Sequence, residues 1–570
     1  MTNKDKSSKK RKYDAIVIGS GISGGWAAKE LAEKGLKTLI LERGPDVKHI
    51  IDYPTTTMQP WDFEHGLNLP LKEREENPIA SKCYIFKEDA KQFVVKDKEH
   101  PYVQDKPFDW IRGYQVGGKS LLWARETQRW SHLDFEGPGR DGFAVEWPVT
   151  YDELAPWYSY VEKFAGITGN KDGLESLPDG EFMKPFEQSC VEEYFDKFLQ
   201  KNYENRRAII ARKAHITDPQ DIHTQQGRAR CMHRNLCQRG CPYGGYFSSN
   251  ASTIPWALNT GNCTLRADSV VQSIIYDEQK GKAVGVKVID RISKEEIDFF
   301  ADIIFVNAAA MNTTALLLNS TSSRFPNGIG NDNELMGTHI AFHNYRARVS
   351  GSYEGFPDKT TSGRRVGGSY MPRWRNLYEQ ETDFIRGYAA GFSTGKGEYF
   401  GRDGVGADLK NNLLDRQTGG AWHVGSHMMG ETIPKASSKL TLDKSKTDEW
   451  GIPLIHFDLD YDDNDEKMVK DYLENTVDMF EKAGFTNIRT SDSKQAPGLD
   501  IHEMGGVRMG KDPKTSLLNK YNQLHECKNV FVTDGAMMTS TSTQNPSLTY
   551  MAFTARAVDY AVKEMKKGNL

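Results

Sequence analysis

Cysteine is scarce in this chain, which has seven cysteines among 570 residues. Four of them, Cys83, Cys190, Cys263 and Cys527, lie far apart, and the total is odd. A disulfide-stapled secreted domain is normally short and carries an even number of cysteines. The sequence therefore predicts mostly reduced thiols and folding in the cytoplasm.

The sequence also lacks long apolar runs and an excess of charge of one sign. No run of 18 apolar residues occurs, and the start, "MTNKDKSSKKRKYD", is basic with no apolar segment behind it. A membrane-spanning helix needs about 20 apolar residues and a signal peptide needs an apolar core, so neither is predicted. The formal net charge is -4 with both signs interspersed, so no basic face for nucleic acid is expected.

What is present begins with a glycine-rich turn between two apolar runs. The stretch "YDAIVIGSGISGGWAAKELAEKGLKTLILERG" predicts a buried strand, a turn, a helix and a second strand. Gly19, Gly21 and Gly24 have the spacing G-x-G-x-x-G, in which the backbone approaches a pyrophosphate at a helix N-terminus. Glu42 follows Gly24 by 18 residues, at the end of the second strand, where a carboxylate can accept both ribose hydroxyls. The sequence therefore predicts a dinucleotide-binding βαβ unit.

The glycine spacing alone does not separate NAD from FAD. A polar and aromatic stretch from about 50 to 110 replaces the regular alternation of a plain NAD domain, which favours a flavoprotein. Strands are expected again over 264–310, and residues 346–494 are strand-rich with a helix near 464–483. We therefore expect a split FAD-binding domain over residues 12–160, 226–345 and 495–570, and a substrate lobe over residues 161–225 and 346–494.

Five segments in matching order carry a family resemblance. They are the glycine turn with Glu42, "GGKSLLWARETQR" after residue 116, "HEMGGVRMG", "VTDGAMM" and "NPSLTYMAFTARA". Together they resemble the glucose-methanol-choline (GMC) flavin oxidoreductases over most of the chain. The resemblance implies an α/β fold, in which a Rossmann-like FAD-binding domain carries an inserted α+β substrate-binding lobe.

The resemblance also implies a catalytic pair. In the family, the histidine of the H-x-x-G-x-x-R-M-G segment faces the flavin N5 and acts as a base, and here it is His502, with Asn545 as its partner. An imidazole can take a hydroxyl proton and an amide can hold the developing alkoxide. Alone, the two would be interpreted as a core histidine and a turn. The resemblance further assigns flavin binding to Gly117, Gly118, Ser120, Val270, Asp534, Pro546 and Thr549.

Two other positions bear on metal and flavin binding. His423 and His427 have a metal-binding helix spacing, but Gly425 and strand-like surroundings argue against a helix. We interpret them as substrate-lobe residues near the pocket, and Trp422 as a core residue. Leu122 stands where some sugar oxidases of the family carry the histidine that binds FAD covalently, so the resemblance implies non-covalent FAD.

Three of the seven cysteines, Cys231, Cys237 and Cys241, fall in one segment, "RCMHRNLCQRGCPYGG". Their spacing resembles that in the catalytic subunits of bacterial membrane-linked glucose and fructose dehydrogenases of the family, which carry a [3Fe-4S] cluster near the flavin. Three thiolates suit such a cluster because each iron takes one protein sulfur. Zinc bound with the help of His233, and inert thiols in an irregular loop, are the alternatives.

The resemblance implies an FAD-dependent dehydrogenase that oxidises a ring hydroxyl of a sugar or glycoside, with C3 as one position, and passes electrons through an iron-sulfur cluster. Glucoside 3-dehydrogenase and gluconate 2-dehydrogenase large subunits are similar, which implies a small partner subunit resembling gluconate 2-dehydrogenase subunit 3 and a cytochrome or quinone acceptor. Co-export with that partner implies the periplasm, and the cytoplasm is the alternative. The other hypotheses are an oxygen-using sugar oxidase with a structural cysteine loop, and a non-catalytic flavin electron-transfer module.

Overall fold

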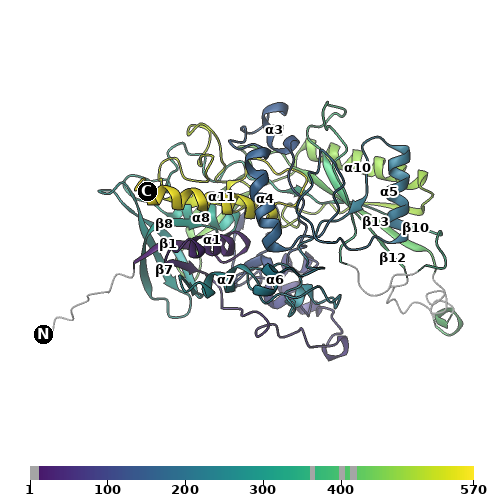
Figure 1. The fold of residues 1–570 in the computed structure, drawn as a ribbon, viewed down its shortest axis with the longest axis horizontal. Coiled ribbons are helices and arrows are strands. Elements are labelled where there is room, and N and C mark those ends of the chain that lie inside the picture. The colour runs from purple at the N-terminus through teal and green to yellow at the C-terminus, as the bar shows by residue number, and fades with distance from the viewer. Residues whose placement is uncertain (1–11, 360–365, 397–404, 411–419) are drawn as a thin grey trace.

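The computed structural model describes residues 12–359, 366–396, 405–410 and 420–570. Two large sheets occupy opposite ends of the molecule, the first containing β1, β7 and β8 and the second containing β10, β12 and β13 (Figure 1). Helices cover both sheets, and the arrangement confirms the predicted α/β class. Within the described residues, no helix combines the length and the apolar character that crossing a membrane requires.

The first sheet begins with the predicted βαβ unit. β1 (Lys12–Ile18) lies parallel to β2 (Thr38–Leu41), and α1 (Ile22–Glu33) connects them. Both strands are largely apolar and buried, as parallel strands between helices must be. The sheet is completed by β5 (Cys263–Arg266) beside β2, and beyond β1 by β8 (Glu296–Val306), β7 (Lys282–Asp290), β6 (Ser269–Asp277) and β17 (Val530–Val532).

Three parallel strands of this sheet end at the same edge. β8 pairs with β1 on one side and with β17 on the other. The glycine turn after β1, Asn307 after β8 and Asp534 after β17 therefore meet there, and the side chain of Asn307 accepts a hydrogen bond from the Thr533 hydroxyl at 2.8 Å. Ligands of open α/β sheets bind at this carboxyl edge.

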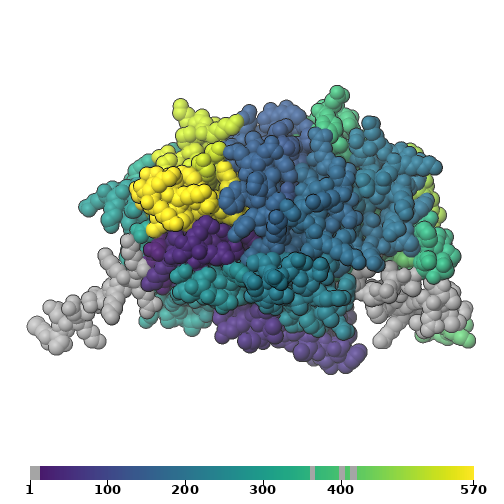
Figure 2. Space-filling model, viewed as in Figure 1, coloured from purple at the N-terminus to yellow at the C-terminus, as the bar shows by residue number. Residues whose placement is uncertain are grey.

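Helices from distant parts of the sequence pack together beside the first sheet. α11 (Ser547–Lys566) packs against α1 and against α4 (Tyr151–Ala165), and Figure 2 shows the C-terminal and N-terminal regions side by side. Ala27 and Leu31 of α1 share one apolar core with Ala557 and Val558 of α11. The remaining helices here and nearby are α2 (Leu71–Glu76), α3 (His132–Asp141), α6 (Asp221–Gln225), α7 (Thr253–Asn259) and α8 (Ala310–Asn319).

The second sheet is antiparallel and carries two helices. Its strands are, in order, β16 (Thr486–Asp492), β10 (Ala347–Tyr353), β13 (Trp422–Glu431), β12 (Tyr388–Gly395), β11 (Ser369–Met371) and β4 (Ile209–Ile210), with β9 (His343–Asn344) beside β13. α5 (Cys190–Asn202) and α10 (Asp463–Lys482) pack on it, and the rings of Phe195 and Phe480 lie 5.7 Å apart. α10 matches the helix predicted near 464–483.

A small third sheet joins distant parts of the chain. β14 (Lys439–Thr447) and β15 (Pro453–Asp458) form a hairpin, and the two-residue β3 (Val103–Gln104) adds parallel to β15. The strand-rich stretch predicted over 346–494 therefore contributes to two sheets, and its hairpin contacts the segment from about 100 to 110 that the sequence left without regular structure.

Candidate active site

A cavity of about 630 Å³ lies between the first and second sheets. Its wall includes the glycine turn, Glu42 and the segment 118–126 on one side, and Tyr370, Phe392 and His427 from the second sheet. Cavities of this size hold cofactors and small substrates. The predicted cofactor and substrate regions therefore meet in one space.

The glycine turn leaves room for a ligand at one of its three glycines. Gly19 has φ +94°, and a Cβ there would overlap the carbonyl oxygen of Asn307, while a Cβ at Gly24 would overlap the carbonyl oxygen of Gly19. A Cβ at Gly21 would meet no atom within 4 Å, and Gly21 lines the cavity. The turn is thus tightly packed at Gly19 and Gly24 and open at Gly21, where a pyrophosphate could approach the backbone closely.

Glu42 lies directly after β2 with its carboxylate in the cavity wall. One carboxylate oxygen accepts hydrogen bonds from the Ser20 hydroxyl at 2.6 Å and the Ser20 amide at 3.1 Å, and the other accepts from the Gly44 amide at 3.0 Å. Burial raises the pKa of Glu42 against these hydrogen bonds. The turn therefore orients the carboxylate that the sequence analysis assigns to the ribose.

The other predicted flavin-binding residues divide into two groups. Gly118, Ser120, Val270, Asp534 and Pro546 line the cavity. Gly24, Gly117 and Thr549 lie behind the wall: the Gly117 amide donates to the Ser20 hydroxyl at 3.0 Å, and the Thr549 hydroxyl pairs with that of Tyr158 at 2.7 Å. Gly117 and Thr549 therefore hold neighbouring elements in place.

The two predicted catalytic residues are brought together at the cavity wall. Nδ2 of Asn545 donates to Nε2 of His502 at 3.1 Å, and both residues line the cavity. Burial, with smaller contributions from His343 and Lys119, holds the pKa of His502 well below its ordinary value of 6.5. The imidazole is therefore neutral near pH 7, the state in which it can accept a proton.

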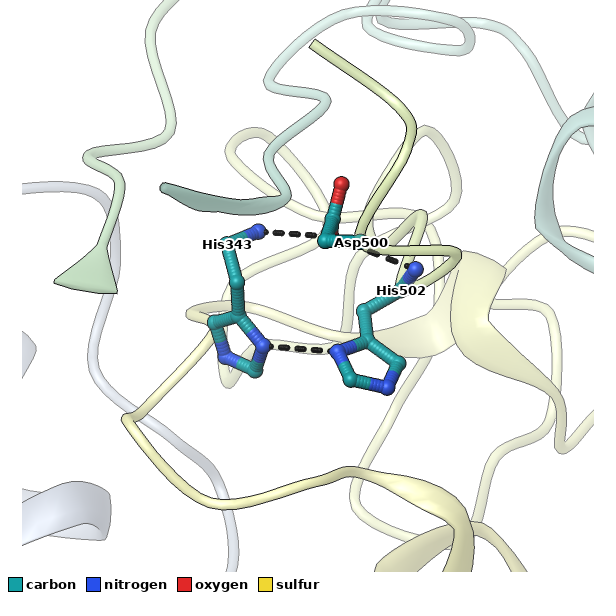
Figure 3. A group of neighbouring side chains, drawn as sticks. All are labelled: His343, Asp500 and His502. Carbon is teal, nitrogen blue, oxygen red and sulfur yellow. Dashed lines mark hydrogen bonds between the residues drawn. The ribbon is translucent and has the colours of Figure 1, made fainter. Parts of the chain in front are cut away.

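His343 and Asp500, which the sequence analysis missed, complete this cluster (Figure 3). Nδ1 of His343 lies 2.9 Å from Nδ1 of His502, and one Asp500 oxygen accepts the backbone amides of both histidines, at 2.9 and 3.2 Å. His343 precedes its partner by 159 residues and lies in no recognisable motif. The only sequence signal was the acidic residue two positions before His502.

Further polar groups line the same cavity. Lys213 forms an ion pair with Glu126, and both line the cavity together with Tyr345 and His427. Burial, reinforced by Arg348, lowers the pKa of His427 to about 4. His427 thus lies near the pocket as predicted, but the prediction was wrong for His423, which is exposed on the same strand and does not line the cavity. Trp422 is buried in the core, also as predicted.

A second cavity, of about 110 Å³, is lined by Cys231, Cys237 and Cys241. It shares Ala124, Arg125, Lys213 and Gly367 with the wall of the main cavity. All three cysteines have free thiols. The segment that the sequence singled out is therefore separated from the main cavity by a thin layer of shared residues.

A histidine adds a nitrogen to the sulfur groups of this second cavity. Nε2 of His215 lies 3.8 Å from the sulfur of Cys237, and the buried Nδ1 of His215 has no hydrogen-bond partner. In the described residues, the only three His, Cys, Asp or Glu side chains whose ligand atoms all lie within 4.8 Å of one another are His343, Asp500 and His502. The three cysteine sulfurs are therefore not all within 4.8 Å of one another.

A dinucleotide-binding sheet joined to a histidine–asparagine pair in the cavity wall is the arrangement expected of an oxidoreductase with a dinucleotide cofactor. Residues 110–343 and 434–554 match the N- and C-terminal models of the GMC oxidoreductase family, which together span more than half of the chain. The chain belongs to the GMC oxidoreductase family, whose members act on CH–OH groups. Residues 14–53 match an FAD binding domain, which supports FAD as the cofactor.

Individual relatives are distant but cover nearly the whole chain. The 2-methyl-1,2-propanediol dehydrogenase of Mycolicibacterium austroafricanum is 25% identical, over 96% of this chain and 94% of its own. The fructose dehydrogenase large subunit of Gluconobacter japonicus is 25% identical, over 97% and 98%. An Aspergillus oryzae formate oxidase variant has a similar structure, with a TM-score of 0.61, 14% identity and coverage of 98% and 99%. This last likeness concerns the fold alone.

Proposed function

We propose that this chain is an FAD-dependent dehydrogenase that oxidises a ring hydroxyl of a sugar or glycoside, with C3 as the first position to test. The observation that carries the proposal is the His502–Asn545 pair at 3.1 Å, in which a neutral imidazole and an amide stand together in the wall of the main cavity. The Glu126–Lys213 ion pair in the same wall suits a substrate with several hydroxyls, because it offers an acceptor and a donor side by side.

In this proposal each protein group has a defined task. Nε2 of His502 accepts the hydroxyl proton while the carbon gives up its hydride and the C–O bond becomes a carbonyl. The Asn545 amide donates to the substrate oxygen as negative charge develops there. FAD, when bound, supplies the hydride acceptor. Gly21 and Glu42 would hold its pyrophosphate and ribose, and Leu122, which lines the cavity, offers no atom for a covalent link.

We further propose that Cys231, Cys237 and Cys241 hold a [3Fe-4S] cluster, which would supply a one-electron acceptor beside the flavin cavity. Support comes from the three cysteines lining one cavity and from the wall that this cavity shares with the main cavity. With such a cluster, the enzyme would be a dehydrogenase that works with a small partner subunit and passes its electrons to an external cytochrome or quinone. The Gluconobacter relative is itself named as a large subunit. Export to the periplasm with that partner belongs to the same proposal.

The test is flavin reduction in the purified holoenzyme under nitrogen, with sugars, glycosides and simple aliphatic alcohols offered one at a time. We expect cyclic polyols to bleach the flavin, and simple alcohols to do so much more slowly. Product analysis then identifies the oxidised carbon. If dithionite bleaches the flavin and none of the polyols does, the proposed substrate class is wrong, and a preference for a small diol would point to the Mycolicibacterium relative instead.

A further inference from the structure

We infer that His343 is a positioning residue that fixes the proton of His502 on Nδ1 and so leaves Nε2 unprotonated, the state in which it can act as the base. The inference rests on the proposed function, since it concerns the residue to which that function assigns proton abstraction. Its evidence is independent, however, because it follows from the direction of each hydrogen bond behind His502.

The chain of hydrogen bonds starts at two backbone carbonyls. Nε2 of His343 lies 3.2 Å from the carbonyl oxygen of Thr541 and 3.0 Å from that of Ser542. A carbonyl can only accept, so Nε2 of His343 must carry a hydrogen. Burial lowers the pKa of His343 to about 4 despite these two bonds, so the ring is neutral near pH 7 and carries a single N–H hydrogen. Nδ1 of His343 is therefore an acceptor.

The acceptor on His343 determines the tautomer of His502. Its Nδ1 lies 2.9 Å from Nδ1 of His343 and must donate, so Nδ1 carries the hydrogen and Nε2 of the neutral His502 ring has none. The contact on the other side agrees, because Nδ2 of Asn545 donates to that same Nε2. In each hydrogen bond of this chain, the donor thus lies on the Asn545 side and the acceptor lies on the side of the two carbonyls.

Burial, ring packing and backbone hydrogen bonds fix the position of His343 relative to His502. His343 is fully buried, and the two imidazole rings are 5.0 Å apart at 83°. One Asp500 oxygen accepts the backbone amides of both histidines, so their main chains cannot separate without breaking that contact (Figure 3). The charged and titratable groups around His502 are His343, Asp500, Lys119 in its 2.9 Å ion pair with Glu503, and Tyr550.

The same contact affects the basicity of His502. When Nε2 takes up a proton, the imidazolium donates a charge-assisted hydrogen bond from Nδ1 to His343, which is stronger than the bond in the neutral state. A hydrogen bond that favours the charged form raises the pKa. Loss of the acceptor should therefore lower the pKa of His502, weaken the base and allow the wrong tautomer.

The test compares His343→Phe, which removes the acceptor, with His343→Asn, whose amide oxygen can occupy the place of Nδ1. We expect flavin reduction in the Phe variant to be about 10²-fold slower, which is the contribution of a well-placed acid–base group. We also expect the acid limb of its pH–rate profile to move to lower pH. The Asn variant should stay within about tenfold of the wild type with an unmoved limb. His525→Phe, a histidine remote from the cavity, controls for loss of an imidazole and should reduce normally.

Equal losses in the Phe and Asn variants, a slow Phe variant with an unmoved acid limb, or a Phe variant at the wild-type rate would each overturn the inference. His343→Leu serves as the acceptor-free variant if the Phe variant fails to retain FAD. Failure of the proposed function is distinguishable, because in that case the wild-type flavin is not reduced by any hydroxyl substrate.

Discussion

Gly21 and Gly19 belong to the same turn, yet their surroundings require glycine for different reasons. At Gly21 the backbone borders open space in the main cavity, whereas at Gly19 φ is positive and the carbonyl of Asn307 leaves no room for a side chain. One position is constrained by the ligand and the other by the fold. The spacing of the glycines in the sequence predicts both but does not separate the two reasons.

This difference gives a matched pair of variants. Gly21→Ala should leave the apoprotein as stable as the wild type and weaken FAD binding about tenfold or more, because a displaced hydrogen bond to a charged group costs roughly 1.5–3 kcal/mol. Gly19→Ala should destabilise the apoprotein by more than about 1 kcal/mol. Thermal melting of the apoproteins and fluorescence titration with FAD measure the two effects. Unchanged FAD affinity in Gly21→Ala would show that no phosphate approaches this residue.

The contact between the two proposed catalytic residues was predictable because short motifs contain them. His502 and Asn545 lie in two short C-terminal segments, and their 3.1 Å contact agrees with the sequence-based pairing. His343 was not predictable, because its contact with His502 depends on β9 lying against β13 at the edge of the second sheet. An isolated buried histidine carries no signal of its own in the sequence.

At the scale of elements, local patterns predicted the long segments and missed the short non-local ones. α10 follows from the buried Met468, Tyr472 and Met479 on one face and from Asp462, which accepts the amide of Asn464 at 3.0 Å at the start of the helix. β3 has two residues and exists only because β15 lies beside it. No window of sequence contains both partners, so periodicity cannot find such a strand.

The cysteine segment is the element with the most specific prediction. Anaerobically prepared protein should contain about three irons per chain and show the paramagnetic signal of an oxidised [3Fe-4S] cluster. Serine at Cys231, Cys237 or Cys241 should leave flavin reduction by substrate largely intact and slow electron delivery to a quinone or cytochrome. Cys190→Ser, on α5 and outside the second cavity, is the control and should change neither step.

One equivalent of zinc without iron would contradict this account of the segment. So would unimpaired acceptor turnover in all three serine variants. Either result would return the segment to a structural role and would favour oxygen as the electron acceptor. The account of the main cavity does not depend on that outcome, because the two cavities use different residues for their chemistry.

At the scale of the whole molecule, the active site forms where the two large sheets meet. The first sheet and α11 supply the glycine turn, Glu42 and Asn545, while the second supplies Tyr370, Phe392 and His427. The α/β class was predictable, because the motifs near both chain ends contribute to one sheet. Which side chains of the second sheet face the cavity was not, because their strands pair across long stretches of sequence.

Proton abstraction by His502 during flavin reduction can be tested in a single rapid-mixing experiment. His502→Ala, loaded with FAD, is mixed with the preferred hydroxyl substrate under nitrogen in a stopped-flow instrument beside the wild type. The account predicts that the Ala variant retains FAD and reduces it about 10²- to 10⁴-fold more slowly. Flavin reduction at the wild-type rate in His502→Ala would contradict the account.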